Sequence, residues 1–151
     1  MLGKYYEEFS VAERFSTRAR TITEADIVAF AGLSGDFNPL HTDEEYARKT
    51  PFGKRVAHGL LGLAVQSGLT QALGLTEGTL VAFLGLTWSF KAPIFIGDTI
   101  RVVQTVESVR ETRNPERGIV VFTCQVLNQR GETVQEGTKT LMVRRRPPFV
   151  D

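Results

Sequence analysis

An aspartate and a histidine lie five residues apart in this chain, and together they could activate a water molecule. Asp36 and His41 are separated by Phe37-Asn38-Pro39-Leu40, and the Asn-Pro step favours a turn. A tight turn can direct a carboxylate and an imidazole at one point. Such a pair can hold a water between its groups and move the water's protons, which is general acid–base catalysis. A solvated surface turn is the alternative interpretation of this segment.

A second segment that could take part in this chemistry begins at His58-Gly59. Residues 59–73 carry apolar side chains on nearly every face, which predicts a helix buried on all sides and roughly 22 Å long. The backbone N–H groups at its start, beginning with Gly59, could polarise a carbonyl oxygen. A water-activating pair beside a carbonyl polariser suits adding water to an alkene conjugated to a carbonyl, or removing it.

Other kinds of chemistry have less support. Two histidines and one cysteine are too few for a zinc site, which needs about four ligands or three plus water, so we expect no metal. Cys124 lies within an apolar strand pattern and is expected in the core. No serine lies in a nucleophile-elbow pattern, and no glycine-rich phosphate loop follows a strand.

The composition predicts one soluble domain, residues 1–151, with 42% hydrophobic and 23% charged residues. A formal net charge of +1 gives no field that favours nucleic acid or an acidic membrane surface. The single cysteine excludes an intramolecular disulfide and fits a reducing compartment. Residues 1–8 lack the apolar run of a signal peptide, and no segment approaches ~20 uninterrupted apolar residues. We expect a cytoplasmic protein.

Before the long helix, alternation over residues 14–21 predicts one short strand. Thr23 is expected to cap a helix that Gly35 ends, and Asp43 to cap a short helix that runs through Arg48. The intervening segment is expected to be loop.

After the long helix, four strands joined by short connections are predicted at residues 79–90, 99–109, 119–128 and 133–145. The last three are linked by turns at 114–118 and 129–131, and are therefore antiparallel. In the third strand the alternate residues Val120, Phe122, Cys124 and Val126 form an apolar face. The predicted class is α+β, an antiparallel sheet wrapped around a long central helix.

Phe30 and the segment Leu33–His41 closely resemble the hydratase signature of the MaoC-like dehydratases, in particular the (R)-specific enoyl-CoA hydratases. The resemblance continues in the same order through Val56–Leu60, Gln66–Leu69 and Phe90–Asp98. It implies the hot dog fold, a sheet wrapped around one long helix. It also implies a hydro-lyase that reversibly hydrates trans-2-enoyl-CoA to (R)-3-hydroxyacyl-CoA, with a coenzyme A thioester as substrate and no cofactor.

The resemblance assigns roles to individual residues, and the sequence matches at each of these positions. Asp36 and His41 are expected to bind the water. The backbone N–H of Gly59 is expected to donate to the thioester carbonyl. Ser67, in the central helix, is expected to support the catalytic histidine or the water.

Three supporting residues have a purely structural alternative. Asn38 is expected to fix the turn through side-chain to backbone bonds rather than to touch substrate. His58 is expected to be a hydrogen-bonding residue rather than an acid or base. Ser67 could instead be a small helix residue without a role.

Related functions on the same fold stay open. The acyl carrier could be acyl carrier protein, or the acyl group branched or dicarboxylic. Thioester hydrolysis is disfavoured by the Asp–Asn–His loop before the helix, and a non-catalytic acyl-binding subunit by the intact Asp36 and His41. Because one helix leaves the sheet edges uncovered, and because resembling families pair two domains edge to edge, we expect a homodimer.

Overall fold

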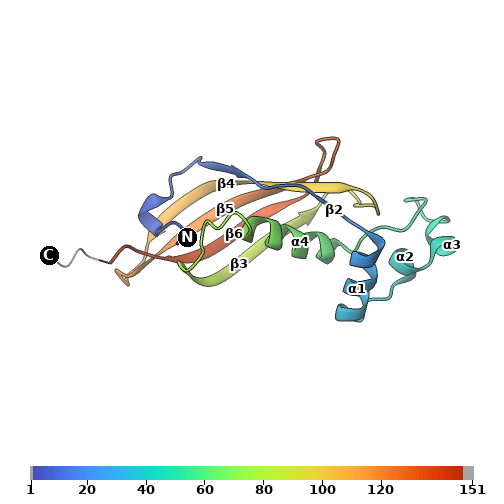
Figure 1. Ribbon diagram of the computed structural model, residues 1–151, viewed down its shortest axis with the longest axis horizontal. Helices are drawn as coiled ribbons and strands as arrows, with labels where there is room; N and C mark the ends of the chain where they lie inside the picture. Colours follow the sequence, from blue (N-terminus) through green and yellow to red (C-terminus); the bar gives the residue numbers. More distant parts are fainter. Residues whose placement is uncertain (1, 148–151) are drawn as a thin grey trace.

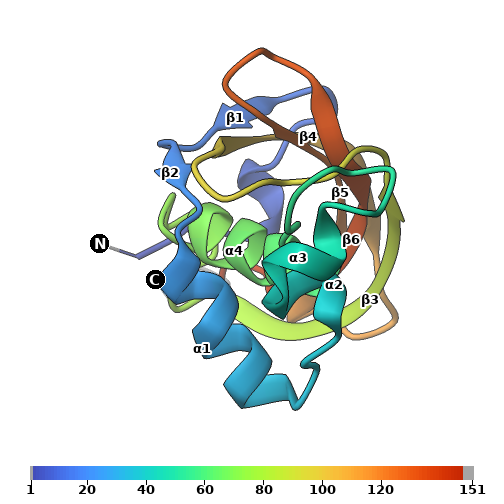
Figure 2. The same ribbon diagram turned by 90° about the vertical axis from the view of Figure 1, so that its right-hand side faces the viewer.

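A curled antiparallel sheet encloses one side of a central helix, α4, which spans Gly59–Gln71 (Figures 1 and 2). The computed structural model describes residues 2–147, so Met1 and residues 148–151 of the predicted domain lie outside the described residues. The shorter helices α1 (Glu24–Ser34), α2 (Pro39–Thr42) and α3 (Glu44–Ala47) gather at the end of the molecule where α4 begins (Figure 1). Among residues 2–147, no helix is both long and apolar enough to span a bilayer.

In the described part of the chain the sheet has six strands in the order β1-β4-β5-β6-β3, with β2 also paired to β4, and every pairing there is antiparallel. The strands are β1 Arg14–Ser16, β2 Arg20–Thr21, β3 Leu80–Phe90, β4 Thr99–Glu111, β5 Arg117–Leu127 and β6 Thr133–Arg144. The other helices are the 3₁₀ helix η1 Tyr6–Glu8, α1 Glu24–Ser34, α2 Pro39–Thr42 and α3 Glu44–Ala47. The α+β prediction is therefore confirmed, and the four long strands lie where the sequence placed them.

The prediction of a single strand over residues 14–21 is wrong, because the chain forms two short strands separated by residues 17–19. The hydroxyl of Thr17 accepts the N–H of Val102 at 2.9 Å. A side-chain oxygen thus takes the place of a main-chain carbonyl in the ladder, and regular pairing stops there.

Local capping signals are confirmed. The hydroxyl of Thr23 accepts the N–H of Asp26 at 3.3 Å, and the Asp26 carboxylate accepts the N–H of Thr23 at 2.9 Å. Gly35 ends α1 with φ 77°, in the left-handed region that glycine adopts without strain. Asp43 caps α3 by accepting the N–H of Tyr46 at 3.0 Å.

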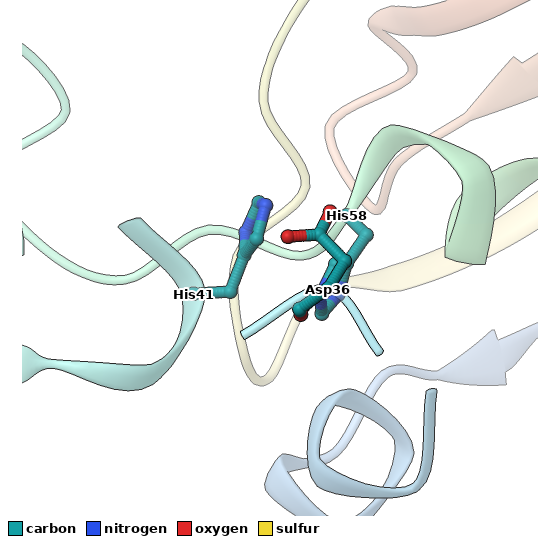
Figure 3. A group of neighbouring side chains, drawn as sticks. All are labelled: Asp36, His41 and His58. Carbon is teal, nitrogen blue, oxygen red and sulfur yellow. The ribbon is translucent and has the colours of Figure 1, made fainter. Parts of the chain in front are cut away.

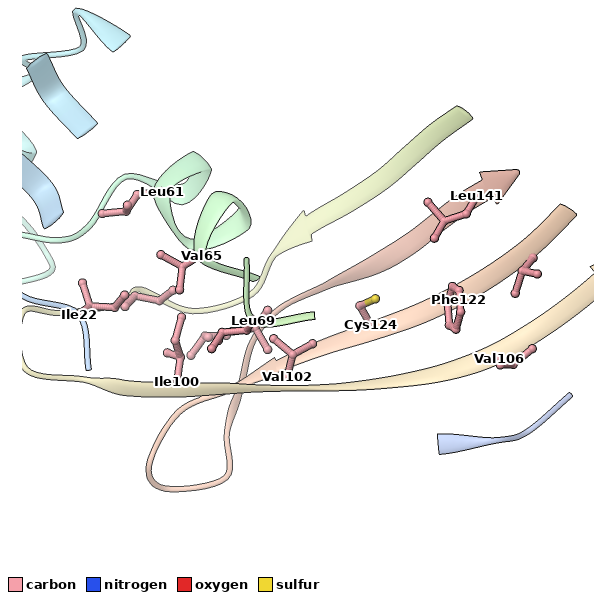
Figure 4. Close-up of a cluster of buried hydrophobic side chains, with 14 of the residues drawn as sticks. Ile22, Leu61, Val65, Leu69, Ile100, Val102, Val106, Phe122, Cys124 and Leu141 are labelled. Atoms are coloured by element: carbon pink, nitrogen blue, oxygen red, sulfur yellow. The ribbon is translucent and has the colours of Figure 1, made fainter. Parts of the chain in front are cut away.

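The core fills the space between α4 and the concave face of the sheet (Figure 4). Leu61, Val65 and Leu69 from α4 face strand residues such as Val102 and Leu141. The alternate apolar face predicted for β5 is confirmed, since its four residues are buried: Val120, Phe122, Cys124 and Val126. Burial raises the pKa of the Cys124 thiol.

The prediction that α4 is buried on every side is wrong for the single chain. Leu60 is 60% exposed, and Ala64, Ser67 and Gly68 are also exposed. The sheet curls around only part of the helix, and its edge strand β3 leaves apolar side chains in contact with solvent. The apolar residues of α4 therefore serve two faces, of which the sheet covers one.

A substitution in β6 tests how closely the strands pack. We expect Gly137→Ala to lower the free energy of unfolding by about 1–3 kcal/mol, because the new methyl would collide with the carbonyl oxygen of Thr87 and the ring of Trp88. Urea denaturation followed by the fluorescence of Trp88, the single tryptophan, measures the change.

The matched control is Gly32→Ala in α1, where an added Cβ meets nothing within 4 Å. This variant should be more stable than the wild type by about 0.5–1 kcal/mol, because alanine loses less backbone entropy in a helix. Wild-type stability in Gly137→Ala would contradict the close packing.

Candidate active site

The end of α1 fixes Asp36. The hydroxyl of Ser34 donates to the carbonyl of Phe30 at 2.7 Å and accepts the N–H of Asp36 at 3.1 Å. One carboxylate oxygen of Asp36 accepts the N–H of Asn38 at 3.1 Å. The aspartate is exposed, so its second oxygen is available to a water or substrate.

His41 lies on a one-turn helix, α2, and the prediction of a loop there is wrong. Asn38 caps this helix, since its side-chain oxygen accepts the N–H of Leu40 at 2.9 Å. Pro39 occupies the first turn, where its missing N–H costs nothing. Asn38 therefore fixes the turn, and the turn carries His41 on a rigid backbone.

A hydrogen bond to Val56 sets the orientation of the His41 ring. Its Nδ1 lies 2.7 Å from the carbonyl oxygen of Val56. Because a carbonyl only accepts, Nδ1 carries the proton, and Nε2 is left to accept a hydrogen bond. The carboxylate of Asp36 faces the His41 ring (Figure 3).

His58 supports both residues from the start of α4. Its ring stacks on His41 with centroids 3.8 Å apart, and it contacts Phe30 at 4.9 Å. Its Nε2 lies 2.9 Å from the carbonyl oxygen of Asp36, to which it donates. The ring is 3% exposed, and its Nδ1 has no hydrogen-bond partner within residues 2–147. This geometry makes His58 a structural link between Asp36 and His41.

A cleft of about 530 Å³ lies beside His41 and the first turn of α4. Its walls include Gly59, Leu60, Phe90 and Gln135. The His58 side chain does not cap α4, and in the described chain the N–H of Gly59 donates to no acceptor. A free donor at a helix N-terminus suits a developing negative charge on a substrate oxygen.

The backbone at Gly59 also packs closely. A Cβ there would lie 2.7 Å from the ring of Phe90. The Gly59 carbonyl accepts from the amide of Gln135 at 3.0 Å, and the Gln135 oxygen accepts from the indole N–H of Trp88 at 3.0 Å. A side chain at position 59 would therefore crowd the ring of Phe90, on β3, at the wall of the cleft.

Ser67 lies apart from this site. It is eight residues beyond Gly59 on α4, roughly 12 Å along the helix, and on the exposed face. Within residues 2–147 its side chain makes no hydrogen bond to Asp36 or His41; it lines a second hollow, between α4 and β3.

Three side chains at the site could offer ligand atoms to a metal. These atoms, from Asp36, His41 and His58, lie within 4.8 Å of one another. Two of the four imidazole nitrogens already donate to carbonyl groups. Three ligands without a fourth fit a structural zinc site poorly.

Three contacts that support the site could not be predicted from the sequence. They are made by Gln135, Val56 and Phe30. Val56 orients His41 through its backbone, so its side-chain type carries no signal. Gln135 is 2% exposed, on the inner face of β6. A polar residue on that face would indicate a role in the site, but the sequence alone does not show which face of β6 is the inner one. Phe30 belongs to the sequence signature, but its contact with His58 depends on the fold.

The chain shares sequence and structure with known proteins. The family model of the MaoC like domain matches residues 8–126. An (R)-specific enoyl-CoA hydratase from Rhodospirillum rubrum is 39% identical over 142 residues, which cover 92% of this chain and 91% of the relative.

Two solved structures extend the comparison. One from Archaeoglobus fulgius, described as a monoamine oxidase regulatory protein, is 36% identical with a TM-score of 0.91 and covers 97% of this chain and 98% of its own. A Mycobacterium tuberculosis protein described as having a double hotdog fold is 18% identical, with a TM-score of 0.81 over 99% of this chain and 46% of its own. The latter likeness concerns the fold alone, and it confirms the hot dog prediction.

Removing the cap of α2 tests the support of His41. We expect Asn38→Ala to lower the free energy of unfolding by about 0.5–2 kcal/mol, because the N–H of Leu40 loses its acceptor. Asn38→Ser, which keeps an oxygen in capping position, should retain most of the wild-type value. Urea denaturation compares the three proteins, and equal stability of the alanine and serine variants would contradict a capping role.

Proposed function

Because the chain belongs to the MaoC-like dehydratase family, we propose that it is a hydro-lyase that reversibly hydrates trans-2-enoyl-CoA to (R)-3-hydroxyacyl-CoA. The observation that carries the proposal is the position of Asp36 facing His41 beside the free N-terminus of α4. A 39% identical relative named for this reaction supports the same substrate class.

The geometry suggests how the water is activated. A water between the two residues donates one hydrogen bond to the free oxygen of Asp36 and one to Nε2 of His41. Its oxygen lone pair is then directed at C3 of the enoyl group. As the oxygen adds to C3, one water proton passes to the pair, and the pair delivers one proton to C2. Dehydration follows the same steps in reverse.

Gly59 stabilises the charge that this addition creates. Attack at C3 moves electrons through C2 to the thioester oxygen, which becomes an enolate oxygen. The N–H of Gly59 and the positive end of the α4 dipole stabilise that oxygen more than the ground-state carbonyl. We assign Asp36, His41 and Gly59 to catalysis, and His58 and Asn38 to positioning.

No cofactor or metal is needed in this scheme. Proton transfer comes from the two side chains, and carbonyl polarisation from the backbone. The proposal places the reaction in the cytoplasm, in keeping with a single, buried, free cysteine.

We further propose a homodimer formed through β3. This strand is an edge of the sheet and has no charged residue. Four of its apolar side chains are each more than 40% exposed: Leu80, Phe83, Leu84 and Phe90. A long apolar edge without charge invites pairing with a second strand.

Substitution of the water-binding pair tests the reaction. We expect Asp36→Asn and His41→Ala each to lower kcat by at least ~10²-fold, the scale for losing a positioned acid or base. Asp36→Asn keeps the side-chain shape, so its melting temperature should match the wild type. Activity within a few fold of wild type in either variant would exclude the assigned roles.

The assay follows the enoyl-thioester absorbance of crotonyl-CoA and, in parallel, free thiol. Loss of absorbance without thiol supports hydration, whereas thiol release would indicate a thioesterase. No change in either would favour a non-catalytic protein. A sample dialysed against EDTA should keep full activity.

Sedimentation tests the dimer. We expect the wild type to sediment as a dimer at micromolar concentration and Leu84→Lys to sediment as a monomer, because a charge on the edge of β3 opposes pairing. Val11→Lys, at a residue 60% exposed outside β3, is the control and should remain dimeric. A monomeric wild type would rule out the proposal.

A further inference from the structure

A second hollow, of about 300 Å³, lies between α4 and the sheet beyond the candidate active site. Leu60 lines both this hollow and the cleft beside His41, so the two spaces adjoin at that residue. A smaller hollow of about 110 Å³ follows, and shares Ser67 and Lys139 with the second. The three spaces therefore follow α4 from its first turn towards its C-terminal end.

The far part of this path contains the side chain of a buried lysine. Lys139 on β6 is 7% exposed, and its ammonium donates to the hydroxyl of Thr70 at 3.0 Å. No carboxylate lies within 4 Å of it in residues 2–147, and its titratable neighbour is the thiol of Cys124. Burial lowers the pKa of Lys139, which reflects the cost of a buried charge without a counterion.

A buried amide lies beside the same hollow without a partner. Gln66 is fully buried, and neither its side-chain nitrogen nor its oxygen has a hydrogen-bond partner in the described chain. A buried polar group without a hydrogen-bond partner destabilises the fold, and such groups are rare in proteins. A ligand that forms hydrogen bonds with the Gln66 amide would remove this cost. Gln66, Ser67 and Lys139 all line the hollow, and each carries a hydrogen-bond donor.

We propose that this hollow binds a carboxylate at the far end of the acyl chain, so that the enzyme prefers thioesters of dicarboxylic acids. This inference rests on the proposed function, because the path starts where the thioester would bind. The carboxylate supplies the counterion that Lys139 lacks and accepts from the amide of Gln66. Charge-assisted bonds of this kind are stronger than neutral ones.

The dimensions select the length of the acyl group. Ser67 and Thr70 lie roughly 12–16 Å along α4 from Gly59. That distance suits a medium-length chain in extended form. A short acyl group such as crotonyl would end before the hollow and would make no contact with Lys139 or Gln66.

Two substrates that differ only in the terminal group test the inference. We expect wild-type kcat/KM to be at least about tenfold higher for trans-2-decenedioyl-CoA than for trans-2-decenoyl-CoA, the scale of a hydrogen bond to a charged group. Lys139→Met should remove this preference by lowering the value for the diacid. Lys49→Met, at an exposed lysine outside the site, should keep it.

Gln66→Leu is a second variant, for the case in which Lys139→Met does not fold. If Lys139→Met has lost its cooperative thermal transition, Gln66→Leu should reduce the diacid preference on its own. A wild type that prefers the monoacid or treats both alike would overturn the inference, as would a preference that survives both substitutions. Wild-type hydration of crotonyl-CoA is measured separately, so that failure of the proposed function is told apart from failure of this inference.

Discussion

The close approach of α4 to the sheet at Gly62 is the constraint on which the rest of the structure depends. A Cβ at this position would lie 2.8 Å from Ile94 and would also collide with the amide of Gln135. At position 62 the helix can therefore approach the sheet this closely only because the residue has no side chain. With α4 held there, Leu61, Val65 and Leu69 meet the strands and exclude water from the core.

The same contact positions the residues of the candidate active site. Gln135 binds the carbonyl of Gly59, which holds the first turn of α4 in place beside the cleft. One residue earlier, His58 bonds to the backbone of Asp36 and stacks on His41. Asp36 and His41, the proposed water-binding pair, lie on a loop and a one-turn helix, elements with little stability of their own. Their geometry thus derives from the helix that they precede.

The features that could be predicted from the sequence are those that depend on neighbouring residues. Thr23, Gly35 and Asp43 act within one turn of the backbone, so their roles could be predicted from residue type. Asp36 and His41 are close in the chain, and their proximity in space followed from the turn. The fold class followed from the alternation in β5 and from the short connections between strands.

The features that could not be predicted from the sequence depend on contacts between distant residues. The exposed face of α4 also carries apolar residues, Leu60 and Ala64, and periodicity cannot separate a face against the sheet from one left uncovered. The break at Thr17 needs Val102, far along the chain, to be recognised. The short helix α2 is too brief to give a periodic signal. The separation of Ser67 from His41 needed the path of α4.

The order of strands in the sheet bears on how the chain is made. Within residues 2–147, strand β3 pairs only with β6, Leu80 with Val143 and Phe90 with Gln135. A ribosome releases β3 well before β6, so an apolar, uncharged strand waits without a partner while β4 and β5 are synthesised. Late, non-local pairing of this kind slows folding and leaves the strand open to other chains. The nascent protein consequently has its greatest need of chaperone protection in that interval, before its last strand emerges.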